Sequence, residues 1–179
     1  MKIRSLAAVA CALLALAGCT DAARAPMAPT QTTLTVLGGT IQVNQLLQFA
    51  GLPDLSGVRH AEKLIVASQG GFVELNGYRV DIPAGALPYD ATVTIDLPTD
   101  NVLGKRLLAE FGPHGIQFNT PVTLTFPLTG VLWNGSPIEV ARWENGAWTG
   151  LGGTVSNGKL QGQTPRFSSY GGKYILAGG

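Results

Sequence analysis

Few residue types in this chain can support covalent or acid–base chemistry. Its 179 residues include two cysteines and two histidines, which are Cys11, Cys19, His60 and His114. Cys19 follows an apolar run close to the N-terminus. Two histidines are too few for a His-rich metal centre. We therefore expect no metal and no cofactor.

The first 18 residues have the pattern of a secretory signal peptide. Lys2 and Arg4 supply a basic start to the apolar run Ser5–Ala17. This run is too short to span a bilayer, and it lacks the polar face of a core helix. It closes with Leu-Ala-Gly-Cys, which resembles the lipobox of bacterial lipoproteins. The resemblance implies cleavage before Cys19, which would become the acylated N-terminus of the mature protein.

Cleavage at this point would leave a mature chain without a free thiol. Cys11 would leave with the leader and Cys19 would carry lipid, which excludes a disulfide, a cysteine nucleophile and a zinc–thiolate site. The chain has 12 basic and 11 acidic residues, and the loss of Lys2 and Arg4 makes its formal charge of +1 weakly negative. Such a charge gives no electrostatic footprint for nucleic acid.

Residues 19–33 are expected to form a flexible tether behind the lipid. Thr20–Thr33 is rich in Ala, Pro and Thr and has no hydrophobic period. In the lipoproteins that this chain resembles, an Asp directly after the acylated cysteine retains the protein at the inner membrane. Here Thr20 occupies that place and Asp21 follows it. The resemblance therefore favours the outer membrane, with the domain facing the periplasm or the cell surface.

Residues 34–179 are predicted to form one all-β domain, a sandwich of short antiparallel strands. Four Asn-Gly pairs, the dipeptide that favours type I′ hairpin turns, lie between strand-like segments at 76–77, 134–135, 145–146 and 157–158. Three hairpins follow from them: 72–75 with 78–82, 140–143 with 148–151, and 153–155 with 159–161.

Alternation and composition agree with this prediction. Residues 93–97 and 122–126 each place three apolar side chains on one strand face. Only 45–49 and 102–111 remain as possible short helical turns. The chain is 45% hydrophobic and 13% charged, and its 24 glycines follow no strict period, which excludes collagen and low-complexity disorder.

Five short motifs follow one another between residues 62 and 128. They are Gly70–Leu75, Val80–Leu87, Thr92–Ile95, Phe111–Phe118 and Pro121–Phe126. In this order they resemble the ZU-five domain, a module shared by zonula occludens proteins, netrin receptors of the uncoordinated-five class, ankyrins and bacterial secreted proteins. The resemblance implies a β-sandwich that serves as an interaction or structural module and not as an enzyme.

Two of these motifs are predicted to be corners of the sandwich. In Pro83–Asp90 the proline ends strand pairing, Gly85 permits a tight bend, and Leu87 returns to the core. In Phe111–Asn119 two glycines and a proline set the turn, and we expect the His114 imidazole to bond a backbone carbonyl. Both loops are candidate contacts for a partner, because function on such scaffolds lies in loops.

The dipeptide Phe167–Ser168 raises the possibility of self-cleavage. In relatives that cleave themselves, His-Phe-Ser occupies this place, and the Ser hydroxyl attacks the preceding Phe carbonyl. Here Arg166 replaces the histidine, and arginine cannot act as a base. Cleavage at Ser168 would need His60 or His114 to supply that role. The alternative is that this segment leads into a final strand.

Aromatic residues gather in the C-terminal third of the chain: Trp133, Trp143, Trp148, Tyr170 and Tyr174. Because aromatic faces stack on sugars, Trp143 and Trp148 are candidate surface contacts for a glycan. The alternative is that they are cross-strand neighbours that stabilise the hairpin around residues 144–147.

The sequence thus predicts a lipid-anchored envelope protein that presents a non-catalytic β-sandwich to a protein, cell-wall or glycan partner. Glycan binding through the C-terminal aromatics and self-cleavage before Ser168 remain as alternatives.

Overall fold

The structure is a computed structural model that describes residues 33–36, 39–42, 45–51 and 57–175. The predicted leader, Cys19 and nearly all of the tether lie outside the described residues. None of the described residues belongs to a helix that is long and apolar enough to cross a membrane.

The described chain consists of strands and one short 3₁₀ helix. The elements are β1 Thr33–Val36, β2 Gly39–Gln42, β3 His60–Ile65, β4 Gly71–Leu75, β5 Tyr78–Ile82, β6 Ala91–Asp96, the 3₁₀ helix η1 Leu103–Lys105, β7 Leu108–Gly112, β8 Gln117–Pro127, β9 Ile138–Glu144, β10 Ala147–Gly150, β11 Thr154–Ser156, β12 Lys159–Arg166 and β13 Ser169–Tyr174.

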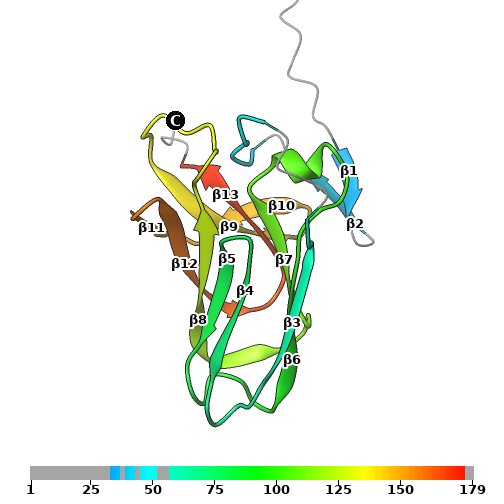
Figure 1. Cartoon of the computed structure of the whole chain (residues 1–179), viewed down its shortest axis with the longest axis vertical. Helices are drawn as coiled ribbons and strands as arrows, with labels where there is room; N and C mark the ends of the chain where they lie inside the picture. Colours follow the sequence, from blue (N-terminus) through cyan, green and yellow to red (C-terminus); the bar gives the residue numbers. More distant parts are fainter. Residues whose placement is uncertain (1–32, 37–38, 43–44, 52–56, 176–179) are drawn as a thin grey trace, which may run out of the picture. The chain divides into compact units, whose positions relative to one another are not determined.

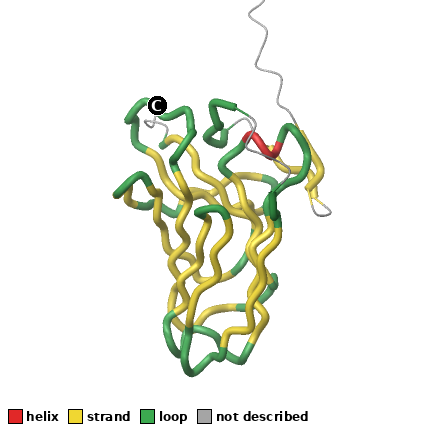
Figure 2. The backbone as a smooth tube through the Cα atoms, in the orientation of Figure 1, coloured by secondary structure: helices red, strands yellow, loops and turns green. Residues whose placement is uncertain are grey.

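Two antiparallel sheets pack against each other as a β-sandwich (Figure 1). One sheet has the order β10-β9-β13-β7-β6-β3, and the other has the order β11-β12-β8-β5-β4. Strands β1 and β2 pair separately as a hairpin. Strands and loops account for nearly all of the described chain, with the short η1 as the exception (Figure 2). The predicted all-β sandwich is confirmed.

All three predicted hairpins form in the predicted pairing, β4 with β5, β9 with β10 and β11 with β12. Both residues of the turns 76–77, 145–146 and 157–158 have positive φ, as a type I′ turn requires. The pair Asn134–Gly135 differs, because only the glycine has positive φ. There the Asn134 side chain accepts a hydrogen bond from the Ser136 N–H at 3.1 Å, which forms a local turn in the loop between β8 and β9.

The structure differs from the prediction in the two segments that could form short helical turns. Residues 45–49 are not helical: they make isolated bridges to β13, to Arg106 and to Val131. Residues 102–111 contain only the three-residue η1, followed by β7. The Asp100 carboxylate accepts hydrogen bonds from the Val102 and Leu103 N–H groups and so starts that turn. Pairing with distant strands outweighed the local pattern in both segments.

The core is crossed by a chain of aromatic rings in edge-to-face contact. Tyr78 of β5 lies 5.6 Å from Phe126 of β8, Phe126 lies 6.1 Å from Phe111 of β7, and Phe111 lies 5.9 Å from Tyr170 of β13, all between ring centroids. The first two rings belong to the five-stranded sheet and the last two to the six-stranded sheet. Edge-to-face geometry adds to the apolar burial that holds the sheets together.

A smaller apolar cluster covers part of the outer face of the six-stranded sheet. Leu46, from the segment 45–49, and Leu103, from η1, pack there on β7, β9 and β10, and they bury Trp148. The two segments thus cover a sheet face that would otherwise be exposed.

Candidate functional site

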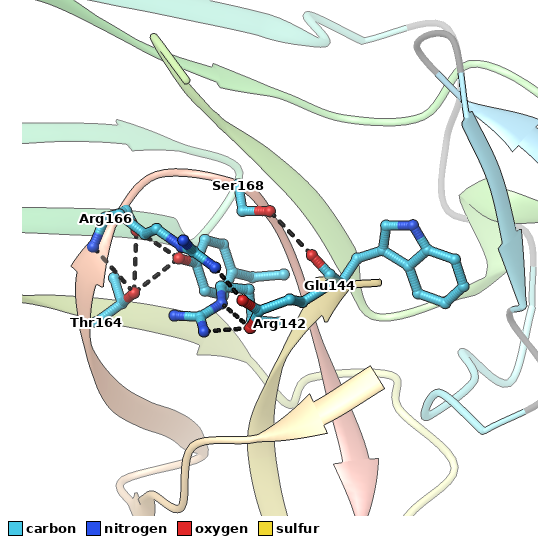
Figure 3. Close-up of polar contacts among 7 residues, drawn as sticks. Arg142, Glu144, Thr164, Arg166 and Ser168 are labelled. Atoms are coloured by element: carbon cyan, nitrogen blue, oxygen red, sulfur yellow. Dashed lines mark hydrogen bonds and ion pairs between the residues drawn. The ribbon is translucent and has the colours of Figure 1, made fainter. Parts of the chain in front are cut away.

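The predicted cleavage site lies in the short link between β12 and β13. The Ser168 hydroxyl donates a hydrogen bond to the Trp143 carbonyl at 3.2 Å (Figure 3). The Phe167 ring is buried and packs edge-to-face on Phe118 at 4.7 Å between centroids. The Ser168 hydroxyl is therefore engaged with β9, and the link continues into β13, which begins at Ser169.

Arg166, which stands where the self-cleaving relatives have histidine, takes part in an ion-pair network. Its guanidinium donates to one Glu144 carboxylate oxygen, and Arg142 donates to the other (Figure 3). Arg166 belongs to β12 and Glu144 to β9, so the contact joins the two sheets. The hydrogen bond from Arg142, followed by that from Arg166, lowers the pKa of Glu144 below its ordinary value.

A buried tyrosine completes this end of the sandwich. The Tyr170 hydroxyl lies 2.7 Å from the Thr164 hydroxyl oxygen and also donates to the Arg166 carbonyl. Thr164 and Tyr170 are both fully buried. Since buried hydroxyls need partners, these bonds hold the backbone of the turn that leads to Ser168. The network in Figure 3 therefore has a clear structural role.

The lowered pKa of Glu144 predicts an acid-sensitive contribution to stability. A carboxylate with a depressed folded-state pKa stabilises the fold above its unfolded pKa, about 4.3, and this contribution is lost as the pH falls through the folded pKa. We expect Glu144→Gln to have a lower Tm than the wild type at pH 7. The difference should shrink as both proteins are titrated below pH about 4, as measured by circular dichroism melts.

The matched control for this prediction is Glu74→Gln. Glu74 also pairs with an arginine, Arg79, but on an exposed face. Exposed pairs contribute little, so its melting curve should follow the wild type. Equal Tm values for Glu144→Gln and wild type across the whole pH range would contradict the role assigned to Glu144.

The two tryptophans proposed as surface contacts have different environments. Trp143 and Trp148 are directly paired across β9 and β10, with ring centroids 5.3 Å apart, which confirms them as cross-strand neighbours. Trp148 is only 4% exposed, because Leu46 and Leu103 cover it. It is therefore not a surface contact, and that prediction was wrong for this residue. Trp143 is partly exposed.

Both histidines contact carboxylates. The His60 Nδ1 lies 2.7 Å from an Asp96 oxygen, and this hydrogen bond raises the pKa of His60. The His114 Nε2 lies 3.4 Å from a Glu110 oxygen, in place of the backbone carbonyl that was expected. The turn after β7 brings His114 back beside this carboxylate. No group of His, Cys, Asp and Glu side chains among the described residues has the geometry of a metal site.

The two candidate contact loops are joined to each other. The Asn119 side chain donates to the Gly85 carbonyl at 3.0 Å, and the Asn119 backbone N–H donates to the Ala86 carbonyl at 2.8 Å. Gly85 has a φ of +79° and Leu87 is buried, as the predicted corner required. The loops 83–90 and 111–119 therefore meet at Asn119, although they are far apart in sequence.

Two neighbouring clefts were not predicted from the sequence. The larger, called here the acidic cleft, has a volume of about 350 Å³ and is lined by His60, Asp96, Glu110 and Ser169 over an apolar floor. These four residues are successive partners across β3, β6, β7 and β13. Two strands thus separate His60 from Ser169, so they are not a nucleophile–base pair.

The smaller cleft, called here the arginine cleft, has a volume of about 170 Å³. Arg59 and Arg106 supply its charge, and its walls are largely apolar, with Phe49, Tyr78 and Pro127 among them. The two clefts share Arg59, Leu97, Pro98 and Leu108 as lining residues. Nothing in the sequence around Arg106 distinguishes it from other charged residues between turns, so its place in a cleft could not be predicted.

Each cleft contains a charged side chain that is partly buried and has one buried polar atom without a hydrogen-bond partner. Desolvation raises the pKa of Glu110, whose Oε2 atom is buried and has no hydrogen-bond partner. Desolvation alone lowers the pKa of Arg106, whose Nε atom is likewise buried and unpartnered. Such groups are uncommon in folded proteins and often occur at functional sites.

Comparisons with known proteins do not add a family to this description. No protein-family model matches the chain, and no curated protein matches it. The fold and site define the protein as a β-sandwich with two neighbouring clefts that each combine charged side chains with apolar walls.

Proposed function

We propose that this chain is a lipid-anchored protein of the bacterial cell envelope whose β-sandwich is a non-catalytic binding module. The lipobox-like Leu-Ala-Gly-Cys ending at Cys19 supports the anchor, and the tether 19–33 would give the domain reach. An acylated cysteine with several chains binds membranes far more stably than a single chain does. The position of Thr20 supports the outer membrane.

One observation above all supports a non-catalytic role. The nucleophile that self-cleavage would need, and the arginine that stands at the position of the expected histidine, are held in structural contacts: the Ser168 hydroxyl donates to the Trp143 carbonyl, and Arg166 pairs with Glu144. General base catalysis requires a proton acceptor within hydrogen-bond reach of the hydroxyl. The contact described for that hydroxyl is a backbone carbonyl, which is not a base.

We further propose that the domain is of the ZU-five type, an interaction or structural module. Support comes from the corners at 83–90 and 111–119, which adopt the bends that those motifs imply and are joined through Asn119. The joined corners offer a surface to a protein or cell-wall partner. This surface is the proposed partner contact.

The intact mass of the protein extracted from membranes tests the proposal. We expect one species that begins at an acylated Cys19 and has no break between Phe167 and Ser168. Ser168→Ala serves as the control and should give the same spectrum apart from the loss of one oxygen atom. A fragment beginning at Ser168 in the wild type and absent from Ser168→Ala would establish self-cleavage and overturn the non-catalytic role.

A further inference from the structure

The arginine cleft combines positive charge with apolar walls. Its lining includes Arg59 and Arg106 and no Asp or Glu. Most of the remaining wall is apolar, formed by Phe49, Tyr78, Leu97, Pro98, Leu108 and Pro127. A cleft of this composition favours a ligand that carries a negative charge on an apolar body, because apolar walls strengthen the attraction between charges.

The Arg106 side chain is partly buried, and its buried Nε atom has no hydrogen-bond partner. Its only described side-chain hydrogen bond runs from Nη1 to the Leu46 carbonyl at 3.3 Å, and no carboxylate among the described residues pairs with it. By contrast, Arg79 and Arg142 each hold a carboxylate and have raised pKa values. A partly buried guanidinium without a counter-ion is costly, and a bound anion would relieve that cost.

We propose that the arginine cleft binds a small organic carboxylate with an apolar tail, whose carboxylate pairs with Arg106. Arg59 is a second cation in the same cleft, and planar guanidinium groups match carboxylate geometry. The volume of about 170 Å³ limits the ligand to a short chain or a single ring. The acidic cleft next to it contains Asp96 and Glu110 and would repel a second negative charge.

The inference rests on the proposed function only in treating the sandwich as a binding module. Binding in solution does not depend on the lipid anchor, so it can fail or succeed independently of the intact-mass measurement that tests the anchor and self-cleavage.

The probe is hexanoate, titrated calorimetrically into the purified protein. Hexanamide keeps the tail without the charge, and inorganic phosphate keeps the charge without the tail. We expect hexanoate to bind and both comparison compounds to bind at least about tenfold more weakly.

Two variants test the cleft by different means. Arg106→Met removes the charge and keeps much of the side-chain volume, and it should weaken hexanoate binding at least about tenfold. Thr129 lines the same cleft on an exposed loop, so Thr129→Glu places a carboxylate there with little risk to folding and should also weaken binding. The matched control is Arg79→Met, an arginine outside the cleft lining, which should bind as the wild type does.

Several results would overturn the inference. Absence of hexanoate binding would remove the site, and equal binding of hexanamide would remove the role of charge. Equal binding of phosphate would show an anion site without an apolar preference. If Arg106→Met does not fold, unchanged binding by Thr129→Glu is sufficient to reject the arginine cleft as the location.

Discussion

A Cys19→Ser variant is expected to incorporate no palmitate label, whereas the wild type should be labelled strongly. The thiol is the nucleophile that accepts the diacylglyceryl group in lipoproteins with this motif, and a serine hydroxyl is far less nucleophilic at neutral pH. Each buried methylene of an acyl chain contributes about 0.8 kcal/mol to membrane binding. Loss of all chains should therefore abolish stable anchoring. The measurement is radiolabelled palmitate in the immunoprecipitated protein.

Cys11→Ser provides the matched control, because it changes the other cysteine within the same leader. It should be labelled as the wild type is. Fractionation of the same cells gives a second readout, with the intact mass showing whether residues 1–18 have been removed. Wild-type labelling of Cys19→Ser, or membrane retention of that variant after loss of residues 1–18, would refute lipid anchoring at Cys19.

A Gly70→Ala variant is expected to lose most of the stability of the domain. Gly70 precedes β4 with a φ of +68°, where a side chain is strained. The three atoms nearest to a Cβ atom there would all belong to the backbone: the Ile82 carbonyl oxygen, the Ala84 nitrogen at 2.6 Å and the Pro83 carbonyl carbon at 2.7 Å. Strain and steric overlap together should cost about 3–5 kcal/mol. Urea unfolding followed by tryptophan fluorescence measures the change.

Gly85→Ala separates the two causes. Gly85 has a similar φ of +79°, but a Cβ atom there would meet nothing within 4 Å. Its cost should be the conformational strain alone, about 1–2 kcal/mol. If the two variants unfold at the same urea concentration, the close backbone approach at Gly70 is not the reason for glycine at that position.

Local sequence patterns were sufficient for much of the sandwich. The turns at 76–77, 145–146 and 157–158 could be predicted because Asn-Gly tolerates positive φ at both positions, a property of the two residues themselves. Alternation in residues 93–97 predicted which side chains of β6 enter the core. The segment 45–49 could not be predicted, because its bridges to β13, Arg106 and Val131 depend on distant residues.

The candidate sites were less accessible to sequence reasoning. The pairing of Trp143 with Trp148 followed from the hairpin, but the burial of Trp148 depended on Leu46 and Leu103, which reach it from elsewhere in the chain. Similarly, Arg166 could be excluded as a base from its residue type alone, while its ion pair with Glu144 required the two sheets to meet.

The sequence alone determined the three hairpins and the all-β class, because these depend on side-chain periodicity and on the φ preferences of neighbouring residues. The tertiary structure alone decided which charges lie together and how far they are removed from water. Arg59 and Arg106 share one cleft although a long stretch of the chain separates them. Electrostatic interactions depend on distance in space and on solvent exposure, neither of which a single sequence records.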